Sequence, residues 1–215
     1  MSIDEICRQY DIRNYTINDD GSVDVDNQVY LVGNDLTKLP LKFGNVSSSF
    51  NCSNNSLTTL EGSPEYVGGY FKCVNNKLTN LKGGPEKVDS YFDCERNELT
   101  TLKDGPKLVG AYFCGFNNLT NLKGCPKEIG GMFSIESSPL TDLVEVPEKM
   151  NKYLVCKNTP LGSIFHNVDL DFIKTFNTFK VIKDGVVNLK RLKYVMELFD
   201  KPIFLDDIKK HYTIK

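Results

Sequence analysis

Residues 71–88 read FKCVNNKLTNLKGGPEKV, and residues 92–109, which begin 21 residues further on, read FDCERNELTTLKDGPKLV. The same pattern recurs in seven copies between residues 27 and 165. A fixed period of this length predicts a solenoid, because each unit can bury its apolar side only against its neighbours. Three apolar columns stay in register through the copies: Leu31, Cys52, Cys73, Cys94, Cys114, Ile135 and Cys156; Leu36, Leu57, Leu78, Leu99, Leu119, Leu140 and Leu161; and Leu39, Leu60, Leu81, Leu102, Leu122, Leu143 and Ile164.

Alternation within each copy predicts a short β-strand at the Phe-x-Cys segment. In the copy quoted first, Phe71 and Cys73 are expected to point inward, and Lys72 and Val74 outward. The Gly-Pro and Ser-Pro pairs that follow the leucines predict an extended return leg rather than a helix. Stacked copies should therefore form one parallel sheet, about 30 Å tall at about 4.8 Å per strand.

The turn after each strand carries a polar residue that we expect to point inward. There an amide can satisfy backbone groups of its own coil and of the adjacent coil. One copy is a residue shorter, because Cys94 and Cys114 are only 20 residues apart. That deletion predicts either a loop adjustment or a bulge that exposes Phe113 and Phe116. The turn residues are Asn34, Asn55, Asn76, Asn97, Asn117, Ser138 and Thr159.

Five of the seven cysteines fall in the first apolar column. Zinc sites need cysteine pairs two to four residues apart, and no such pair occurs. The odd number of cysteines also fits a framework of paired disulfides poorly. Leu31 and Ile135 occupy the same column, so we interpret its thiols as small apolar core groups. No metal and no cofactor is expected.

Composition narrows the class of protein. Hydrophobic residues make up 40% and charged residues 25% of the 215 residues, which is typical of a folded globular chain. The formal net charge of -2 provides no basic field for nucleic acid or for an anionic membrane. No apolar stretch approaches the roughly 18 residues of a membrane span. The first ten residues, MSIDEICRQY, lack the apolar segment of a secretory signal, so a cytoplasmic location is expected.

Catalytic motifs are absent, which favours a protein that is not an enzyme. The sequence contains no GxGxxG, GxxxxGK[ST], GxSxG or HExxH. The two histidines, His166 and His211, lie outside the repeats. A nucleophile pair of Cys156 and His166 is one alternative, although Cys156 lies in the inward column. An enzyme built at this end would need a polar cleft around one of the two histidines.

The ends of the chain differ from the repeats and are expected to cover the open faces of the stack. We divide the chain into an N-terminal cap (residues 1–26), the repeats (27–165) and a helical C-terminal cap (166–215). Residues 2–10 predict a helix that begins with a capping box of Ser2 and Glu5. Asp20-Gly21 predicts a hairpin turn. Residues 170–176, 189–199 and 205–212 predict three helices.

The repeat, written FxCxxNxLTxLxGxPxxV, resembles the short leucine-rich repeat and is most similar to repeats encoded by tailed bacteriophages and prophages. The resemblance covers residues 22 to 165, about two thirds of the chain. It implies a leucine-rich-repeat solenoid of seven coils, with the parallel β-sheet on its concave side and mostly extended return legs. Repeat modules of bacterial effector ubiquitin ligases are also similar, but those carry a large catalytic domain after the repeats, and only about 50 residues follow them here.

The outward positions of the sheet are the candidate binding surface. Aromatic residues, methionine and arginine are enriched at the centres of protein interfaces, and charged residues would rim this patch. The alternative is that the rings only stack along the ladder and stabilise the sheet. Tyr30, Ser49, Ser53 and Ser134 are also expected to point outward. The candidate partner-binding residues are Tyr70, Lys72, Tyr91, Asp93, Glu95, Arg96, Phe113, Phe116, Met132 and Tyr153.

The leading hypothesis is therefore a protein-binding module, encoded by a phage, that acts on a host protein in the host cytoplasm, for example as an inhibitor of a defence or regulatory factor. The first alternative is a structural or assembly protein of the virion, which would associate with itself. The second is an enzyme that uses residues of the C-terminal cap. Nucleic acid is not an expected partner, because the outward columns mix acids with bases, and no membrane partner is expected.

Overall fold

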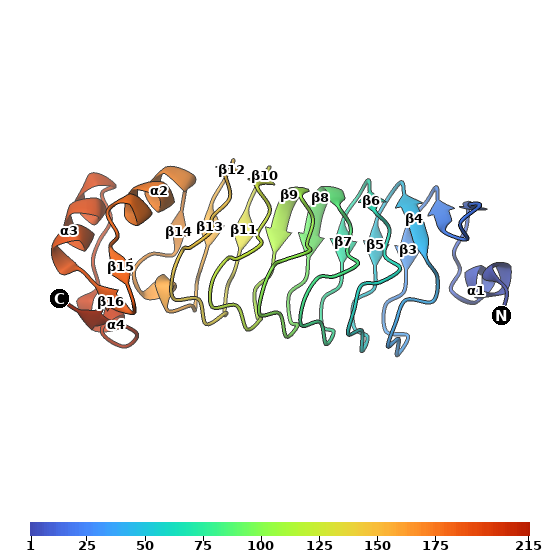
Figure 1. Ribbon diagram of the computed structural model, residues 1–215, viewed down its shortest axis with the longest axis horizontal. Coiled ribbons are helices and arrows are strands. Elements are labelled where there is room, and N and C mark those ends of the chain that lie inside the picture. Colours follow the sequence, from blue (N-terminus) through green and yellow to red (C-terminus); the bar gives the residue numbers. More distant parts are fainter.

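The chain forms a single elongated stack of short coils with helices at both ends, as Figure 1 shows for a computed structural model that describes residues 1–215. The Phe-x-Cys segments build a parallel ladder of seven strands, hence about six turns of the solenoid. We call this the main ladder. Its strands are β3 (Val29–Tyr30), β5 (Phe50–Asn51), β7 (Phe71–Lys72), the second half of β8 (Lys87–Asp93), the second half of β9 (Leu108–Phe113), β11 (Phe133–Ser134) and β13 (Leu154–Val155).

A second parallel ladder runs beside the main one, and the sequence pattern did not predict it. The PxxV end of each return leg pairs with the same segment of the next coil, so that both ladders belong to one 14-stranded sheet. The column that includes Val46, Val67 and Val88 is buried beneath it. The strands of this ladder are β2 (Val23–Val25), β4 (Phe43–Val46), β6 (Tyr66–Val67), the first halves of β8 and β9, β10 (Glu128–Ile129) and β12 (Lys149–Met150).

The core is a set of side-chain columns that repeat from coil to coil. Phe50, Phe71 and Phe92 stack with ring centroids 5.2 Å apart and nearly parallel planes. The five cysteines of the first column are fully buried and form no disulfide. Burial raises the pKa of Cys52 to about 12 and the pKa of Cys94 well above its ordinary value, so these thiols stay protonated. The prediction that they serve as apolar core groups is confirmed.

The inward amide at the turn also forms as predicted. The amide nitrogen of Asn97 donates to the carbonyl oxygens of Cys94 at 3.1 Å and of Cys73, in the preceding coil, at 2.9 Å. Its side-chain oxygen accepts the backbone N–H of Leu78 at 3.1 Å. Asn34 is an exception, because its side chain is exposed at the N-terminal end of the column.

The missing residue of the shorter coil lies in the bend between the two ladders. Val88 pairs with Val109, 21 positions on, but Tyr91 pairs with Ala111, only 20 positions on. Gly110 fits the shortened bend because it has no Cβ, which would lie 2.0 Å from the carbonyl oxygen of Ser90. The deletion is thus taken up by a bulge-type register shift within the β8–β9 pair, the second of the two alternatives, and the main ladder pairs normally again at Phe113. Phe113 is half-buried and Phe116 is exposed.

The N-terminal end begins with helix α1 (Ile3–Gln9), which has the predicted capping box of Ser2 and Glu5. The predicted hairpin follows, with β1 (Tyr15–Ile17) antiparallel to β2 and Gly21 at positive φ in its turn. This hairpin starts the second ladder, so it extends the solenoid sheet.

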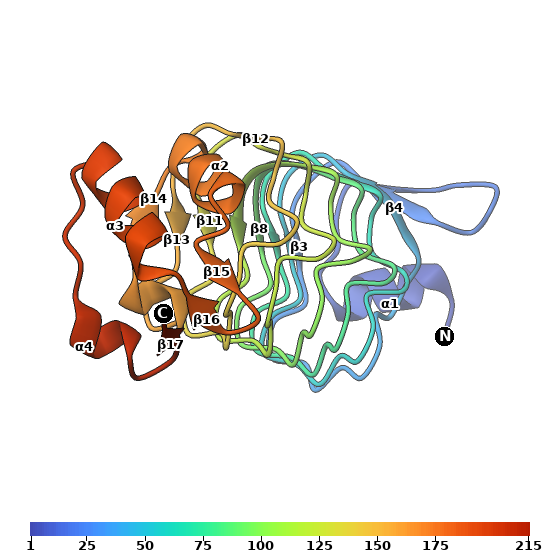
Figure 2. The ribbon, with the colours of Figure 1, turned by 60° about the vertical axis from the view of Figure 1, so that its left-hand side comes forward.

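The C-terminal end is only partly the helical unit that the sequence predicted. Strand β14 (Asn167–Val168) runs antiparallel to β13 after the short 3-10 helix η1 (Leu161–Ser163), and it ends the sheet. Helices α2 (Leu170–Thr178), α3 (Leu189–Leu198) and α4 (Leu205–Ile208) then lie beyond the last coil (Figure 2). A small sheet also forms there, which the helix-spaced apolar residues did not predict. Its strands are β15 (Ile182–Lys183) and β16 (Val186–Val187), between α2 and α3, and β17 (Thr213–Ile214), after α4. No helix in the chain is both long and apolar enough for a bilayer span.

Candidate functional site

The outer side of the main ladder, which we call the ladder face, carries the ten candidate partner-binding residues. None of the ten is buried. Phe116 and Tyr153 are the most accessible of the large apolar side chains among them, at 39% and 55% exposed. Tyr70, Lys72, Tyr91, Asp93, Glu95, Phe113 and Met132 are half-buried, and Arg96 is exposed.

The aromatic rings of the ladder face form a continuous stack over neighbouring coils. Tyr70 and Tyr91 stack at 5.2 Å between centroids, and Tyr91 meets the edge of Phe113 at 5.7 Å. The ammonium of Lys72 lies 5.4 Å from the centroids of both tyrosine rings. Such contacts stabilise adjacent strands, as the alternative interpretation of the rings predicted. They also hold the rings in place, so a partner would meet a surface that is already ordered.

The structure adds one residue to this stack and removes three from the surface. The hydroxyl of Tyr30, which is 50% exposed, lies 2.8 Å from the hydroxyl of Tyr70. The outward alternation pointed to Tyr30, but it was not among the ten candidates. Ser49, Ser53 and Ser134 were expected on the surface and are buried, because their short side chains lie below the level of their larger neighbours.

A group of carboxylates lies beside the rings. Burial raises the pKa of Asp93 above its ordinary value. The pKa of Glu95 is raised as well, first by burial and then by the nearby charges of Asp93 and Glu136. The carboxylates of Asp93 and Glu95 are therefore harder to ionise than free carboxylates. A basic group of a partner would reduce this electrostatic cost.

Two residues of the ladder face occupy an unfavourable backbone conformation. In every coil, the residue two positions after the member of the first apolar column has a positive φ. In two coils this residue is Arg96, with a φ of 55°, or Phe116, with a φ of 53°. Three of the seven coils place an Asn there, one a Gly and one a Ser, and Asn tolerates the left-handed region much better than bulky residues do. The guanidinium carbon of Arg96 lies 4.3 Å from the centroid of the Phe116 ring. Strain of this kind is a reason to look for function at a position.

We predict that Arg96→Asn stabilises the protein by about 0.5–1 kcal/mol, since the relief of left-handed strain exceeds the loss of one exposed cation–π contact. Asn75 donates to the side-chain oxygen of Asn54 at 3.0 Å, and an asparagine at position 96 can extend that chain of amides. Thermal unfolding should show a rise of about 1–4 °C. Arg96→Ala is the control: it loses the contact and keeps the strain, so its melting temperature should fall. A lower melting temperature for both variants would contradict the argument.

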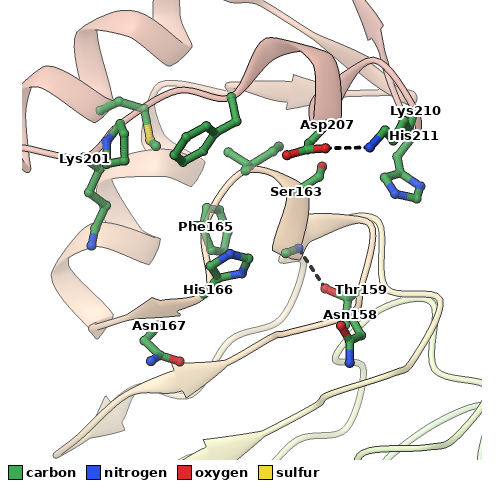
Figure 3. A pocket seen from close by; sticks show the side chains of 15 residues that line it. Asn158, Thr159, Ser163, Phe165, His166, Asn167, Lys201, Asp207, Lys210 and His211 are labelled. Carbon is green, nitrogen blue, oxygen red and sulfur yellow. Dashed lines mark hydrogen bonds and ion pairs between the residues drawn. The ribbon is translucent and has the colours of Figure 1, made fainter.

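A second candidate site lies where the last coil meets the C-terminal helices. The cleft there has a volume of about 430 Å³, and both histidines of the chain line it (Figure 3). We call it the histidine cleft. A polar cleft around His166 or His211 is what an enzyme at this end of the chain would require. No group of three His, Cys, Asp or Glu side chains is arranged to hold a metal ion anywhere in the chain.

The cysteine nearest to this cleft is not set up as a nucleophile. The thiol of Cys156 donates to the carbonyl oxygens of Phe165 at 3.1 Å and His166 at 3.2 Å, and not to an imidazole. Burial raises the pKa of Cys156 to about 12. A thiolate is the reactive form of cysteine, so the alternative of a Cys156–His166 pair is not supported by this geometry.

Comparison with known proteins returns no relative: no family model, no curated protein and no solved structure matches the chain. Functional inference therefore depends on the two sites described above.

Proposed function

We propose that this protein is a non-enzymatic leucine-rich-repeat module that binds another protein through the ladder face, on the concave side of the solenoid. The observation that carries the proposal is the stack of Tyr70, Tyr91 and Phe113, which stays partly exposed although it is ordered by its own contacts. Aromatic residues held in place lose little conformational freedom on binding, and for this reason they dominate interface energetics.

The surroundings of the stack support a protein partner. Lys72, Asp93, Glu95 and Arg96 place both signs of charge around the rings, which fits a mixed protein surface better than a nucleic-acid backbone. Large ordered apolar patches with a charged rim usually mark interaction sites. Met132 and Tyr153 continue the patch toward the C-terminal end.

The resemblance to repeats of tailed bacteriophages suggests the setting in which this binding would occur. We infer that the protein is made by a phage or prophage and acts in the host cytoplasm on a host protein, as an inhibitor of a defence or regulatory factor. The second candidate is a structural or assembly protein of the virion, which would bind copies of itself. The regular repeated surface supports this second candidate, because such a surface could bind another copy of the same solenoid.

Affinity capture from host lysate, followed by mass spectrometry, tests the proposal. We expect Tyr91→Ala/Phe113→Ala to lower recovery of the specific partner by at least about tenfold, because loss of two central aromatic contacts commonly costs more than 2 kcal/mol. The matched control is Phe179→Ala/Tyr194→Ala, which removes another contacting aromatic pair, 5.0 Å apart, in the C-terminal unit.

The control variant should capture the partner as the unchanged protein does. If the ladder variant also retains it, the ladder face is not the binding site. If the protein captures only copies of itself, and the ladder variant abolishes that capture, the virion hypothesis replaces the first one. Circular dichroism of both variants checks that the fold is intact.

A further inference from the structure

Three segments of the chain line the histidine cleft: one from the last coil and two from the C-terminal unit. The last coil forms its floor with residues 158–167, the segment after α3 forms one wall, and α4 with the residues that follow it forms the other. In Figure 3, Lys201 lies on one flank, and Asp207, Lys210 and His211 lie on the opposite flank. The cleft therefore exists only when the C-terminal unit is folded against the solenoid.

Most polar groups of the cleft have no partner within the protein. The imidazoles of His166 and His211 and the amides of Asn158 and Asn167 are exposed and make no side-chain hydrogen bond within the protein. Lys201 forms no ion pair, and its ammonium lies 5.6 Å from the centroid of the Phe172 ring. In the repeats, by contrast, the turn amides are bonded from coil to coil, as Asn75 is to Asn54. The cleft thus presents several hydrogen-bond donors that a ligand could use.

The charges of the cleft favour an anion. Its charged side chains are Lys201 and Lys210 against the single carboxylate of Asp207, and Lys210 already holds that carboxylate at 2.6 Å. Lys210 lowers the pKa of Asp207, and His166 and His211 make smaller contributions in the same direction.

The C-terminal unit that contains most of the cleft also carries a net positive charge. Residues 166–215 contain ten lysine and arginine residues and seven acidic residues. Residues 1–165 contain 16 lysine and arginine residues and 21 acidic residues. A small anion would therefore be attracted to this end of the molecule rather than to the repeats.

Part of the cleft wall is apolar. Phe165 and Met196 are buried beneath its surface, and Phe204, which is 58% exposed, lines it as well. We propose that the histidine cleft binds a small organic anion, with its carboxylate or phosphate toward the basic side chains that line the cleft and its apolar part against Phe204. This site is separate from the ladder face and does not depend on the function proposed for it.

The two histidines provide the test, because both line the cleft and no other histidine adds a signal. The probe is phenylacetate at pH 7, where its carboxylate carries one negative charge. Titration followed by NMR should shift the Hε1 resonances of both imidazoles in a saturable manner.

Two comparison ligands separate the parts of the proposal. 2-Phenylethanol has the ring without the charge, and acetate has the charge without the ring; each should bind at least about fivefold more weakly than phenylacetate. Lys201→Gln should weaken phenylacetate binding, whereas Lys190→Gln, on the outer side of α3, should leave it unchanged. The proposal is overturned if phenylacetate gives no saturable shift, or if 2-phenylethanol binds as tightly.

Discussion

Replacing Asn117 by alanine should destabilise the protein by roughly 2–5 kcal/mol. The amide nitrogen of Asn117 donates to the carbonyl oxygens of Cys94, Cys114 and Gly115 at 3.0–3.1 Å, and its oxygen accepts the N–H of Leu99 at 3.0 Å. The carbonyl of Cys114 and the N–H of Leu99 have no other partner. Each buried group left without a hydrogen bond costs about 1–3 kcal/mol.

Asn118→Ala is the matched control for this variant. Asn118 is the next residue in the same turn, but its side chain is exposed and makes no hydrogen bond. Its replacement should change stability by less than about 0.5 kcal/mol. Urea unfolding of both variants measures the difference. Equal stabilities for the two variants would show that the inward amides do not hold adjacent coils together.

Phe92→Ala should cost about 3–5 kcal/mol, as expected for a large side chain removed from a fully packed core. The ring is fully buried and stacks between Phe71, at 5.2 Å, and Tyr112, at 5.3 Å. Its removal leaves a gap in the middle of the column, which the coils on either side cannot close without giving up the pairing of both ladders.

Phe92→Leu separates the loss of packing from the loss of ring stacking. Leucine keeps much of the buried volume, so we expect a cost well below that of alanine. Denaturant midpoints of the two variants, taken at equal slope, report the comparison. A cost below about 1 kcal/mol for Phe92→Ala would mean that the column tolerates gaps, contrary to the close packing seen here.

The sequence predicted the parts of the fold that repeat. A column such as Cys52, Cys73 and Cys94 has a fixed period, and only a stack of coils buries every member of it. The inward amides followed from the same register. The second ladder was missed because two residues per strand are too few for an alternation to be recognised, although the valine column marked its position.

The ends were harder to predict, because each is present only once. The apolar spacing of residues 189–199 correctly predicted α3. The same approach overlooked Asp184-Gly185, a turn signal equal to Asp20-Gly21, between the strands β15 and β16. The histidine cleft could not be predicted, because it depends on how His166, Lys201 and His211 are brought together by packing.

The contacts of the ladder face also lay beyond the sequence. Alternation indicated which residues point outward, and ten of them were chosen by residue type. It could not indicate that the rings of Tyr70 and Tyr91 stack on each other with the ammonium of Lys72 beside both, or that serines in the same columns are buried.

The shortened bend at Gly110 shows that a coil can lose one residue while the strands of the main ladder in adjacent coils keep their register. Because this bend accommodates a missing residue, the coils on either side of it keep the same side-chain columns. Whole coils could then be inserted or removed to lengthen or shorten the ladder face in steps of about 4.8 Å, with every side-chain column kept in line. Duplication of a 21-residue segment would therefore change the length of the ladder face by one strand spacing.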